Sequence, residues 1–306
     1  MAFVIRKPED IIQAKIMKVL IYGPPGVRKT TFAFTAKRVL LLDFQEGVSR
    51  VEGKYRGEYV FVGNWSDALD LFSQDLTMFD TIAIDPVGNM LDMISYHIME
   101  KNQKLRRGDG ALSLQGYGVL SNQFKEYVTK IEKLGKNIVF IAHDKEVKVK
   151  DDVVYRPDIT GGSLGFVTRE IDLCGYIKSN GGVSTVNFDP SDEYYGKNSC
   201  KLGKNLDITK NSLASIIDMG LDFRNANSIQ YQFYIEQIKK VSEILDNCQS
   251  AEDLNDGYPL IMQMELLPDS LAEAKTLILS KVKQLDLKYN KTSKLYEPKT
   301  KTEVQA

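Results

Sequence analysis

The chain has 306 residues, of which 43% are hydrophobic and 26% charged, and its 40 Lys and Arg residues nearly balance 41 Asp and Glu residues. The hydrophobic fraction excludes a wholly disordered chain, and the net charge of −1 excludes a globally basic nucleic-acid coat. Three cysteines, Cys174, Cys200 and Cys248, lie far apart, which argues against a disulfide framework or a structural zinc site.

Short apolar runs in the first half of the chain predict buried strands. These runs are Lys18–Tyr22, Val39–Leu42, Tyr59–Val62, Thr81–Ile84 and Asn137–Ala142. Runs that are apolar on both faces are typical of a parallel sheet covered by helices on each side. The helices expected in the same region are Thr31–Arg38, Asn64–Phe72, Asn89–Glu100 and Ser121–Leu134. This alternation predicts an α/β fold with a mostly parallel sheet and helices on both faces.

Beyond residue 143 the pattern changes to alternating segments, which predict antiparallel hairpins. Lys145–Tyr155 alternates around Asp151-Asp152, and Cys174–Phe188 alternates around a Ser-Asn-Gly-Gly turn. We therefore expect antiparallel strands late in the sheet.

The last quarter of the chain is helical in pattern. Apolar residues recur at helical spacing in Ile229–Leu245, and Ser270–Glu273 forms a capping box that predicts the start of another helix. The Lys-rich tail Lys281–Ala306 is expected to be flexible. The expected organisation is one domain at residues 1–220 and a helical C-terminal appendage at residues 221–306.

A turn rich in glycine and proline, Gly23–Thr30 (GPPGVRKT), follows the first predicted strand and precedes a predicted helix. This is the pattern and the context of a P-loop, whose backbone N–H groups form a concave anion site. Lys29 is expected to reach the β- and γ-phosphates of ATP, and Thr30 to bind Mg²⁺. An ordinary strand–turn–helix connection is the alternative. The residues expected to bind the nucleotide are Gly23, Pro24, Pro25, Gly26, Val27, Arg28, Lys29, Thr30 and Thr31.

Arg28 stands immediately before the lysine, where the P-loop pattern has glycine. Glycine lets the backbone curve closely around a phosphate with no side chain in the way. Three outcomes are open: the Arg28 side chain points outward and adds positive charge, it strains the loop, or it fills the nucleotide pocket. We expect weaker nucleotide binding than in an Arg28→Gly variant.

Residues at the ends of predicted strands are candidates for the chemistry. Asp85 ends TIAI and is expected beside the Mg²⁺ site, with capping of the next helix as the alternative. Glu46 follows the second strand and is a candidate to position or deprotonate the attacking water, with a solvated acid as the alternative. His143 ends NIVFIA and is a candidate γ-phosphate sensor or a structural histidine. Together with Lys29, Glu46 and His143 form the expected catalytic set.

The motifs GPPGVRKT, LLLDFQEG, TIAID and NIVFIAHD, in this order and spacing, resemble those of phage-encoded RecA-like P-loop nucleotide-binding proteins. Some members of this family act in single-strand annealing and recombination. The similarity covers roughly residues 15–200 and implies a RecA-like P-loop NTPase fold with ATP and Mg²⁺ as ligands. It assigns the nucleotide and Mg²⁺ roles to Lys29, Thr30 and Asp85. Gln45, one residue before Glu46, falls where RecA-type proteins place their catalytic glutamate.

The resemblance also implies partners. Single-stranded DNA is expected, a single-strand binding protein is a candidate second partner, and homo-oligomers in rings or filaments are expected. Lys101–Gly118, which is basic and rich in glycine, and Asp158–Phe166 are candidate DNA loops, with disordered surface loops as the alternative. Arg156 or Arg169 of a neighbouring subunit is a candidate to complete the nucleotide site. Without a secretory signal or an apolar run of about 18 residues, we expect a cytoplasmic protein, in the host cell if phage-encoded, with no membrane partner.

The function expected from these observations is ATP binding and hydrolysis in DNA recombination, repair or single-strand annealing. The alternative is a nucleotide-binding structural or regulatory module that does not hydrolyse ATP, which Arg28 motivates. A small-molecule kinase also has a P-loop, but the sequence shows no obvious Arg-rich lid.

Overall fold

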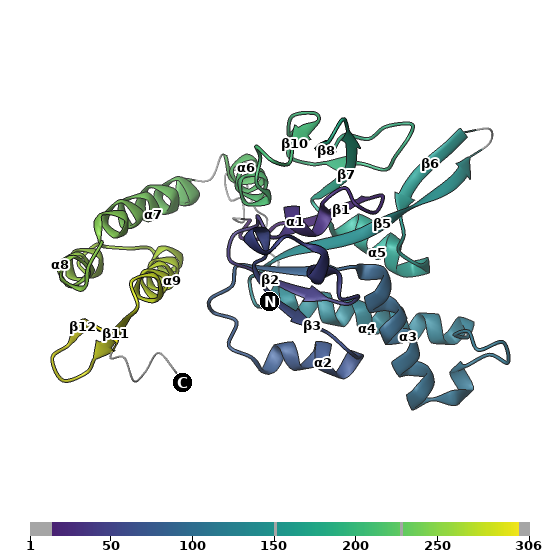
Figure 1. Ribbon diagram of the computed structural model, residues 1–306, viewed down its shortest axis with the longest axis horizontal. Helices are drawn as coiled ribbons and strands as arrows, with labels where there is room; N and C mark the ends of the chain where they lie inside the picture. The colour runs from purple at the N-terminus through teal and green to yellow at the C-terminus, as the bar shows by residue number, and fades with distance from the viewer. Residues whose placement is uncertain (1–13, 150–151, 227–228, 300–306) are drawn as a thin grey trace, which may run out of the picture. The chain divides into compact units, whose positions relative to one another are not determined.

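The computed structural model describes residues 14–149, 152–226 and 229–299 (Figure 1). Two compact units meet in sequence between Arg224 and Asn225. The boundary predicted at residue 220 falls inside helix α6 (Leu213–Asn225). Leu213, Ile216 and Ile217 on this helix are buried in the core of the larger unit, so the helix packs with that unit.

The larger unit is built on a mostly parallel sheet with the strand order β10-β8-β7-β1-β5-β4-β2-β3. The strands that run parallel are β1 (Lys18–Gly23), β2 (Val39–Asp43), β3 (Glu58–Phe61), β4 (Thr81–Asp85), β5 (Asn137–Val149) and β7 (Leu173–Asn180). The strands predicted from the apolar runs are therefore confirmed. β3 differs from the prediction because it lies at the edge of the sheet, where all four of its residues are exposed rather than buried.

The later strands are antiparallel, as predicted. β5 pairs with β6 (Asp152–Pro157), and β7 pairs with β8 (Val183–Asn187) and β9 (Lys197–Asn198). β8 also pairs with the short β10 (Leu206–Asp207). β5 is longer than predicted, because it continues from the sheet into the hairpin with β6 without a break.

Helices cover both faces of this sheet. Alternate strand residues point to opposite sides, so Leu20 and Tyr22 lie in one core cluster, whereas Val19 and Ile21 lie in the other. The helices that contribute to the first cluster are α2 (Trp65–Asp70), α3 (Val87–Lys101), α4 (Leu114–Lys133) and α5 (Gly161–Glu170). α1 (Lys29–Ala33), which is shorter than the predicted Thr31–Arg38 helix, and α6 contribute to the second. The predicted α/β class, with a mostly parallel sheet, late antiparallel strands and C-terminal helices, is confirmed.

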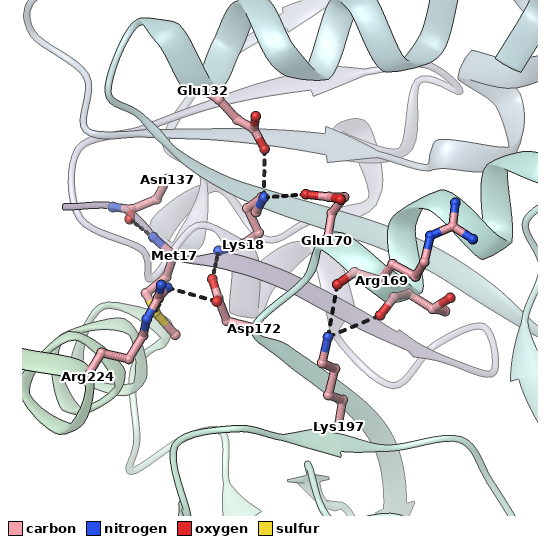
Figure 2. A network of polar contacts seen from close by, with 10 residues as sticks. Met17, Lys18, Glu132, Asn137, Arg169, Glu170, Asp172, Lys197 and Arg224 are labelled. Atoms are coloured by element: carbon pink, nitrogen blue, oxygen red, sulfur yellow. Dashed lines mark hydrogen bonds and ion pairs between the residues drawn. The ribbon is translucent and has the colours of Figure 1, made fainter. Parts of the chain in front are cut away.

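A network of polar contacts holds the start of β1 (Figure 2). The Asp172 carboxylate accepts a hydrogen bond from the Lys18 N–H at 2.8 Å and pairs with the Arg224 guanidinium at 2.8 Å. The Lys18 ammonium pairs with Glu132 at 2.7 Å and with Glu170 at 3.1 Å. These contacts join the first strand to α4, to α5 and to the last turn of α6.

Both candidate DNA loops contain helix that the sequence analysis did not predict. α4 begins at Leu114, where the Ser113 side chain caps it by accepting from the Gly116 N–H at 3.2 Å. α5 begins at Gly161, inside the second candidate loop. The stretch between α3 and α4 includes a short 3₁₀ turn, Gln103–Leu105.

The smaller unit has its own hydrophobic core. Its elements are α7 (Ile229–Asn247), α8 (Ala251–Met262), α9 (Pro268–Gln284) and the hairpin of β11 (Leu287–Asn290) and β12 (Leu295–Pro298). The core residues are Val241, Leu245, Cys248, Leu254, Ile261, Ala274, Ile278 and Leu287. Within the described ranges, none of the helices combines the length and the apolarity that a membrane crossing requires.

Two predictions for the smaller unit are wrong. Ser270 does not cap a helix, because α9 begins at Pro268 and the Ser270 side chain is buried inside that helix. The tail predicted to be flexible from Lys281 contains the end of α9 and the β11–β12 hairpin, in which Leu287 joins the core. Residues 300–306 of that tail lie outside the described residues.

Candidate nucleotide-binding site

The Gly23–Thr30 loop connects the end of β1 to the start of α1, and glycine is required at two of its positions. A Cβ atom at Gly23 would lie 2.5 Å from the carbonyl oxygen of Ile177, so no larger residue fits there. Gly26 has a φ of 83°, a left-handed conformation that glycine adopts without a steric penalty. The loop therefore has the tight turn that the P-loop pattern predicts.

Arg28 also adopts the left-handed conformation, with φ 67° and ψ 30°. This conformation costs a residue with a side chain about 1 kcal/mol. The Arg28 side chain is exposed and lies at the cavity described below, which it does not fill. Of the three outcomes left open by the sequence, the structure thus shows a left-handed backbone and an added positive charge at a cavity that the side chain does not fill.

Lys29 is buried beneath the loop, with only 7% of its surface exposed. Its ammonium group donates to the carbonyl oxygens of Gly23 at 2.7 Å and Pro24 at 2.8 Å. Burial lowers the pKa of Lys29, while the nearby Asp85 carboxylate acts in the opposite direction. The lysine is thus held by weak carbonyl acceptors, which an anionic phosphate can replace.

Thr30 and Asp85, the expected Mg²⁺ pair, are in direct contact. The Thr30 hydroxyl donates to Asp85 Oδ2 at 2.6 Å. Burial raises the pKa of Asp85 to about 6, opposed by the Thr30 hydrogen bond and the Lys29 charge. Asp85 does not cap the following helix, since Pro86 is the N-cap of α3 and no side chain caps that helix. The alternative role considered for Asp85 is therefore wrong.

The turn after β2 is organised by Asp43. Its buried carboxylate accepts hydrogen bonds from the backbone N–H groups of Gln45 at 3.1 Å, Gly47 at 2.9 Å and Val48 at 2.9 Å. This arrangement places Gln45 at the cavity and leaves Glu46 exposed, in a left-handed conformation and outside the cavity lining. Glu46, expected to act on the attacking water, thus lies outside the cavity that the other catalytic candidates, Lys29 and His143, line.

A cavity of about 240 Å³ lies where the loop, the β2 turn, the end of β4 and the middle of β5 meet. Its lining residues are Pro25, Gly26, Arg28, Lys29, Thr30, Thr31, Gln45, Gly47, Arg50, Val51, Asp85 and His143. Val27, expected at the nucleotide, instead packs in the core. Arg50 and Val51 were missed by the sequence analysis, because no motif marks the segment that follows the acidic turn.

His143 lies at the end of the sheet portion of β5, opposite Gly23 in the β1–β5 register. It lines the cavity, and within the described part of the chain its buried Nδ1 atom has no hydrogen-bond partner. Burial and the positive charge of Lys29 lower the pKa of His143, so the imidazole is neutral near pH 7. A neutral histidine with an unused ring nitrogen can hydrogen-bond a ligand or a water molecule in the cavity.

The donor set at this cavity fits a magnesium–phosphate ligand. The described residues contain no cluster of three or more His, Cys, Asp or Glu side chains that could hold a metal ion alone. Mg²⁺ is commonly held by one or two protein ligands together with the phosphates of a nucleotide, and Thr30 and Asp85 supply such a pair. Lys29 and the loop N–H groups supply the phosphate-binding groups.

Arg156 and Arg169, the candidates to complete the nucleotide site of a neighbouring subunit, do not line the cavity of their own chain. Arg156 is exposed on β6 of the hairpin. Arg169 lies in the last turn of α5, next to Glu170, whose ion pair with Lys18 is at the start of β1 (Figure 2). Within one chain, Arg169 is therefore at the opposite end of β1 from the Gly23–Thr30 loop.

Comparison with known proteins gives a family match and two weaker similarities. A family model described as an AAA domain matches residues 15–200. The SPbeta prophage-derived uncharacterized protein YorG of Bacillus subtilis strain 168 is 28% identical over 195 residues, which are 59% of this chain and 57% of that protein. The chain thus matches less than two thirds of that relative's length. The flagellar accessory protein FlaH from Methanocaldococcus jannaschii has 10% identity and a TM-score of 0.35, over 62% of this chain and 83% of FlaH.

The matched region contains every residue that lines the cavity, from Pro25 to His143. It also covers more than half of the chain. The family match implies nucleotide binding, typically with Mg²⁺. The chain belongs to the AAA domain family, and its larger unit is a P-loop NTPase domain.

Proposed function

We propose that this protein binds ATP with Mg²⁺ in the cavity at the Gly23–Thr30 loop and hydrolyses it. The observation that carries the proposal is the 2.6 Å contact between Thr30 and Asp85 beside the buried Lys29 ammonium. An ion-binding pair and a phosphate-binding cation at one cavity are the groups that phosphoryl transfer requires. The site therefore suits ATP together with Mg²⁺.

Hydrolysis needs a group that orients water, and two neutral groups are available. Gln45 and His143 both line the cavity. A glutamine amide can orient a water molecule without accepting its proton, and a neutral imidazole can do both. We propose His143 and Gln45 for this role, together with Lys29 as the group that stabilises charge on the transferred phosphoryl.

The non-hydrolysing alternative also has specific support. Asp85 is the sole carboxylate in the cavity lining of the described residues, and it is engaged by Thr30. The backbone of Arg28 is strained, as shown above. A regulatory module that binds ATP and retains it is consistent with these observations.

A phosphate-release assay on the wild-type protein, with Lys29→Ala as the control, separates these functions. We expect slow release that is lost in Lys29→Ala and increased by single-stranded DNA. ATP binding without any release above that of Lys29→Ala would support the regulatory module. Absence of ATP binding in the wild-type protein would contradict both functions.

We further propose that the protein acts on single-stranded DNA in recombination, repair or annealing, and that it is phage-encoded. The support is the motif resemblance and the prophage-derived relative. A basic, exposed surface lies between α3 and α4, and its cationic residues are Lys101, Lys104, Arg106 and Arg107. Such a surface suits phosphate contacts.

DNA binding can be tested by fluorescence anisotropy with a labelled single-stranded oligonucleotide in the presence of ATP and Mg²⁺. We expect Lys104→Ala/Arg106→Ala to weaken binding and to reduce its salt dependence, because each phosphate contact releases counterions. Lys130→Ala, an exposed lysine paired with Glu126, is the matched control. No binding by the wild-type protein at low salt would contradict a role on DNA.

Homo-oligomers are proposed as well, with a single-strand binding protein as a candidate partner. The edge strand β3 supports self-association, because Tyr59, Val60 and Phe61 are 46%, 46% and 49% exposed. An exposed apolar edge strand is a template for pairing with another chain. Light scattering should show a smaller mass for Val60→Lys than for the wild-type protein. Equal masses at a monomeric value for both proteins would contradict the proposal.

A further inference from the structure

Arg50 lies at the cavity but belongs to no motif that the sequence analysis used. It ends the 3₁₀ turn Gly47–Arg50 after β2 and lines the cavity together with His143. Its positive charge contributes to lowering the pKa of His143, which indicates that the guanidinium and the imidazole share one end of the cavity.

The cavity carries more positive than negative charge. Arg28, Lys29 and Arg50 line it, and Asp85 is the one acidic side chain of the lining among the described residues. No ion pair or hydrogen bond joins the Arg50 side chain to any group in the described ranges, and Asp85 is already in contact with Thr30. This balance of charges favours a polyanionic ligand.

The backbone on both sides of Arg50 is fixed by hydrogen bonds. The guanidinium of Arg56 donates to the carbonyl oxygens of Ser49 at 2.8 Å and Val51 at 2.6 Å, the residues that flank Arg50. The other end of the turn is held by Asp43, as described above. The chain therefore presents Arg50 at the cavity from a preorganised turn, which reduces the entropy lost when the side chain binds an anion.

The strand order determines which end of a triphosphate this turn would meet. β2 lies next to β4, with Asp43 opposite Asp85, and the Phe44 N–H donates to the Asp85 carbonyl oxygen at 2.8 Å. The turn that carries Arg50 thus begins beside the ion-binding carboxylate. In a P-loop the ion bridges the β- and γ-phosphates, whereas the loop N–H groups hold the α- and β-phosphates. Arg50 follows in this turn and lines the cavity with His143, so the γ-phosphate is the part of the ligand that we assign to it.

We propose that Arg50 binds the γ-phosphate of ATP within its own chain and makes the site selective for nucleoside triphosphates over diphosphates. This inference rests on the proposed function, since it requires that ATP occupies the cavity. Arg56 acts as a positioning residue that fixes the turn and makes no contact with the nucleotide. In this arrangement, the chain supplies a phosphate-binding arginine without a neighbouring subunit.

The test is calorimetric measurement of Mg·ATP and Mg·ADP affinities on the full chain. Arg50→Ala should lose about tenfold or more in ATP affinity, because a hydrogen bond to a charged group is removed, and about twofold or less in ADP affinity. Arg50→Lys should retain part of the ATP affinity, since lysine keeps the charge and loses the planar two-point contact. Lys54→Ala, an exposed lysine paired with Glu52 outside the cavity lining, is the matched control and should bind as wild type.

Arg56→Ala should weaken ATP binding in the wild-type background and have no further effect in Arg50→Ala, because both changes act through one side chain. ATP and ADP affinities that fall together in Arg50→Ala, or that both stay at the wild-type value, would overturn the inference while leaving the proposed function intact. If the wild-type protein binds neither nucleotide, the proposed function fails first, and the inference fails with it.

Discussion

Arg28 combines two effects, backbone strain and positive charge, that two substitutions at this position can separate. Its backbone is left-handed, a conformation that disfavours side chains, and its charge lies at a cavity suited to phosphates. Glycine would remove the backbone penalty and the charge together. Alanine would remove the charge and keep the penalty. The pair of variants therefore distinguishes strain from electrostatics at one position.

We predict that Arg28→Gly binds ATP more tightly than the wild-type protein and unfolds with a free energy about 1 kcal/mol higher, because the left-handed backbone is relaxed. Arg28→Ala should bind ATP more weakly than either protein. Calorimetry and urea unfolding measure these two quantities. Equal ATP affinity in the wild-type protein and Arg28→Gly would show that the backbone conformation does not limit binding.

Asp85 makes the nucleotide-free protein sensitive to pH. Its pKa of about 6 in the folded protein is above the usual value of 3.8, chiefly because of burial. The folded protein therefore binds a proton at Asp85 between about pH 4 and pH 6 that the unfolded chain does not bind. Asp85 therefore lowers the free energy of unfolding as pH rises through that window, and this decrease is complete above the folded pKa.

We predict that Asp85→Asn is more stable than the wild-type protein by about 2 kcal/mol at about pH 8, without nucleotide or Mg²⁺. The difference should shrink toward about pH 5, where wild-type Asp85 is mostly protonated. Urea unfolding at the two pH values measures it. Mg²⁺-dependent ATP binding should be lost in the same variant. A variant less stable than wild type at both pH values would contradict the assigned pKa.

At the residue scale, the sequence predicted the positions of side chains that belong to a motif. It did not predict the positions of side chains that depend on the conformation of a turn. The convergence of Lys29, Thr30 and Asp85 follows from the spacing of the loop and from strands that end at one edge. The position of Glu46 outside the cavity does not follow from spacing, because it depends on the hydrogen bonds that Asp43 makes with the turn. Arg50 was missed because no motif marks the segment that follows this turn.

At the element scale, the starts of helices were harder to predict than their existence. α4 begins at Leu114, seven residues before the predicted Ser121, because Ser113 caps it. α9 begins at Pro268, a residue suited to the first turn of a helix, and so the Ser270 capping box is not used. Near the start of each of these helices, several residues could serve as the N-cap, and packing determines which one does.

The polar network at the start of β1 gives a prediction for this scale. In Asp172→Ala, the Lys18 N–H and the Arg224 guanidinium each lose a charged partner. We expect the free energy of unfolding to fall by about 2 kcal/mol, chiefly because the part-buried Lys18 N–H is left unpaired, whereas the Arg224 guanidinium is exposed to water. Glu126→Ala, which removes an exposed ion pair with Lys130, should change it by about 0.5 kcal/mol or less. Urea unfolding of both variants measures the contrast, and equal losses would contradict the role given to the network.

At the scale of the whole molecule, the two units have separate cores. The clusters on either side of the sheet contain residues up to Ile217, and the cluster of the smaller unit begins at Val241. The parallel sheet was predictable because its strands are apolar on both faces. The regular structure that follows Lys281 in the smaller unit was not predictable, because the sequence of its hairpin is rich in lysine and only a few apolar side chains hold it in place.

We predict that residues 1–224, produced without the rest of the chain, fold and bind Mg·ATP within about threefold of the full-length affinity, because the cavity and its supporting cores lie within this part. Circular dichroism and calorimetry test the two statements. A soluble, folded fragment that has lost ATP binding would show that the smaller unit contributes to the site.

The uninterrupted course of β5 has a mechanical consequence. One strand runs from Asn137, through His143 at the cavity, to Val149 in the hairpin. A thirteen-residue strand has a length of about 40 Å. A shift of the His143 backbone on ligand binding would therefore act directly on the hairpin with β6, because both belong to one continuous strand.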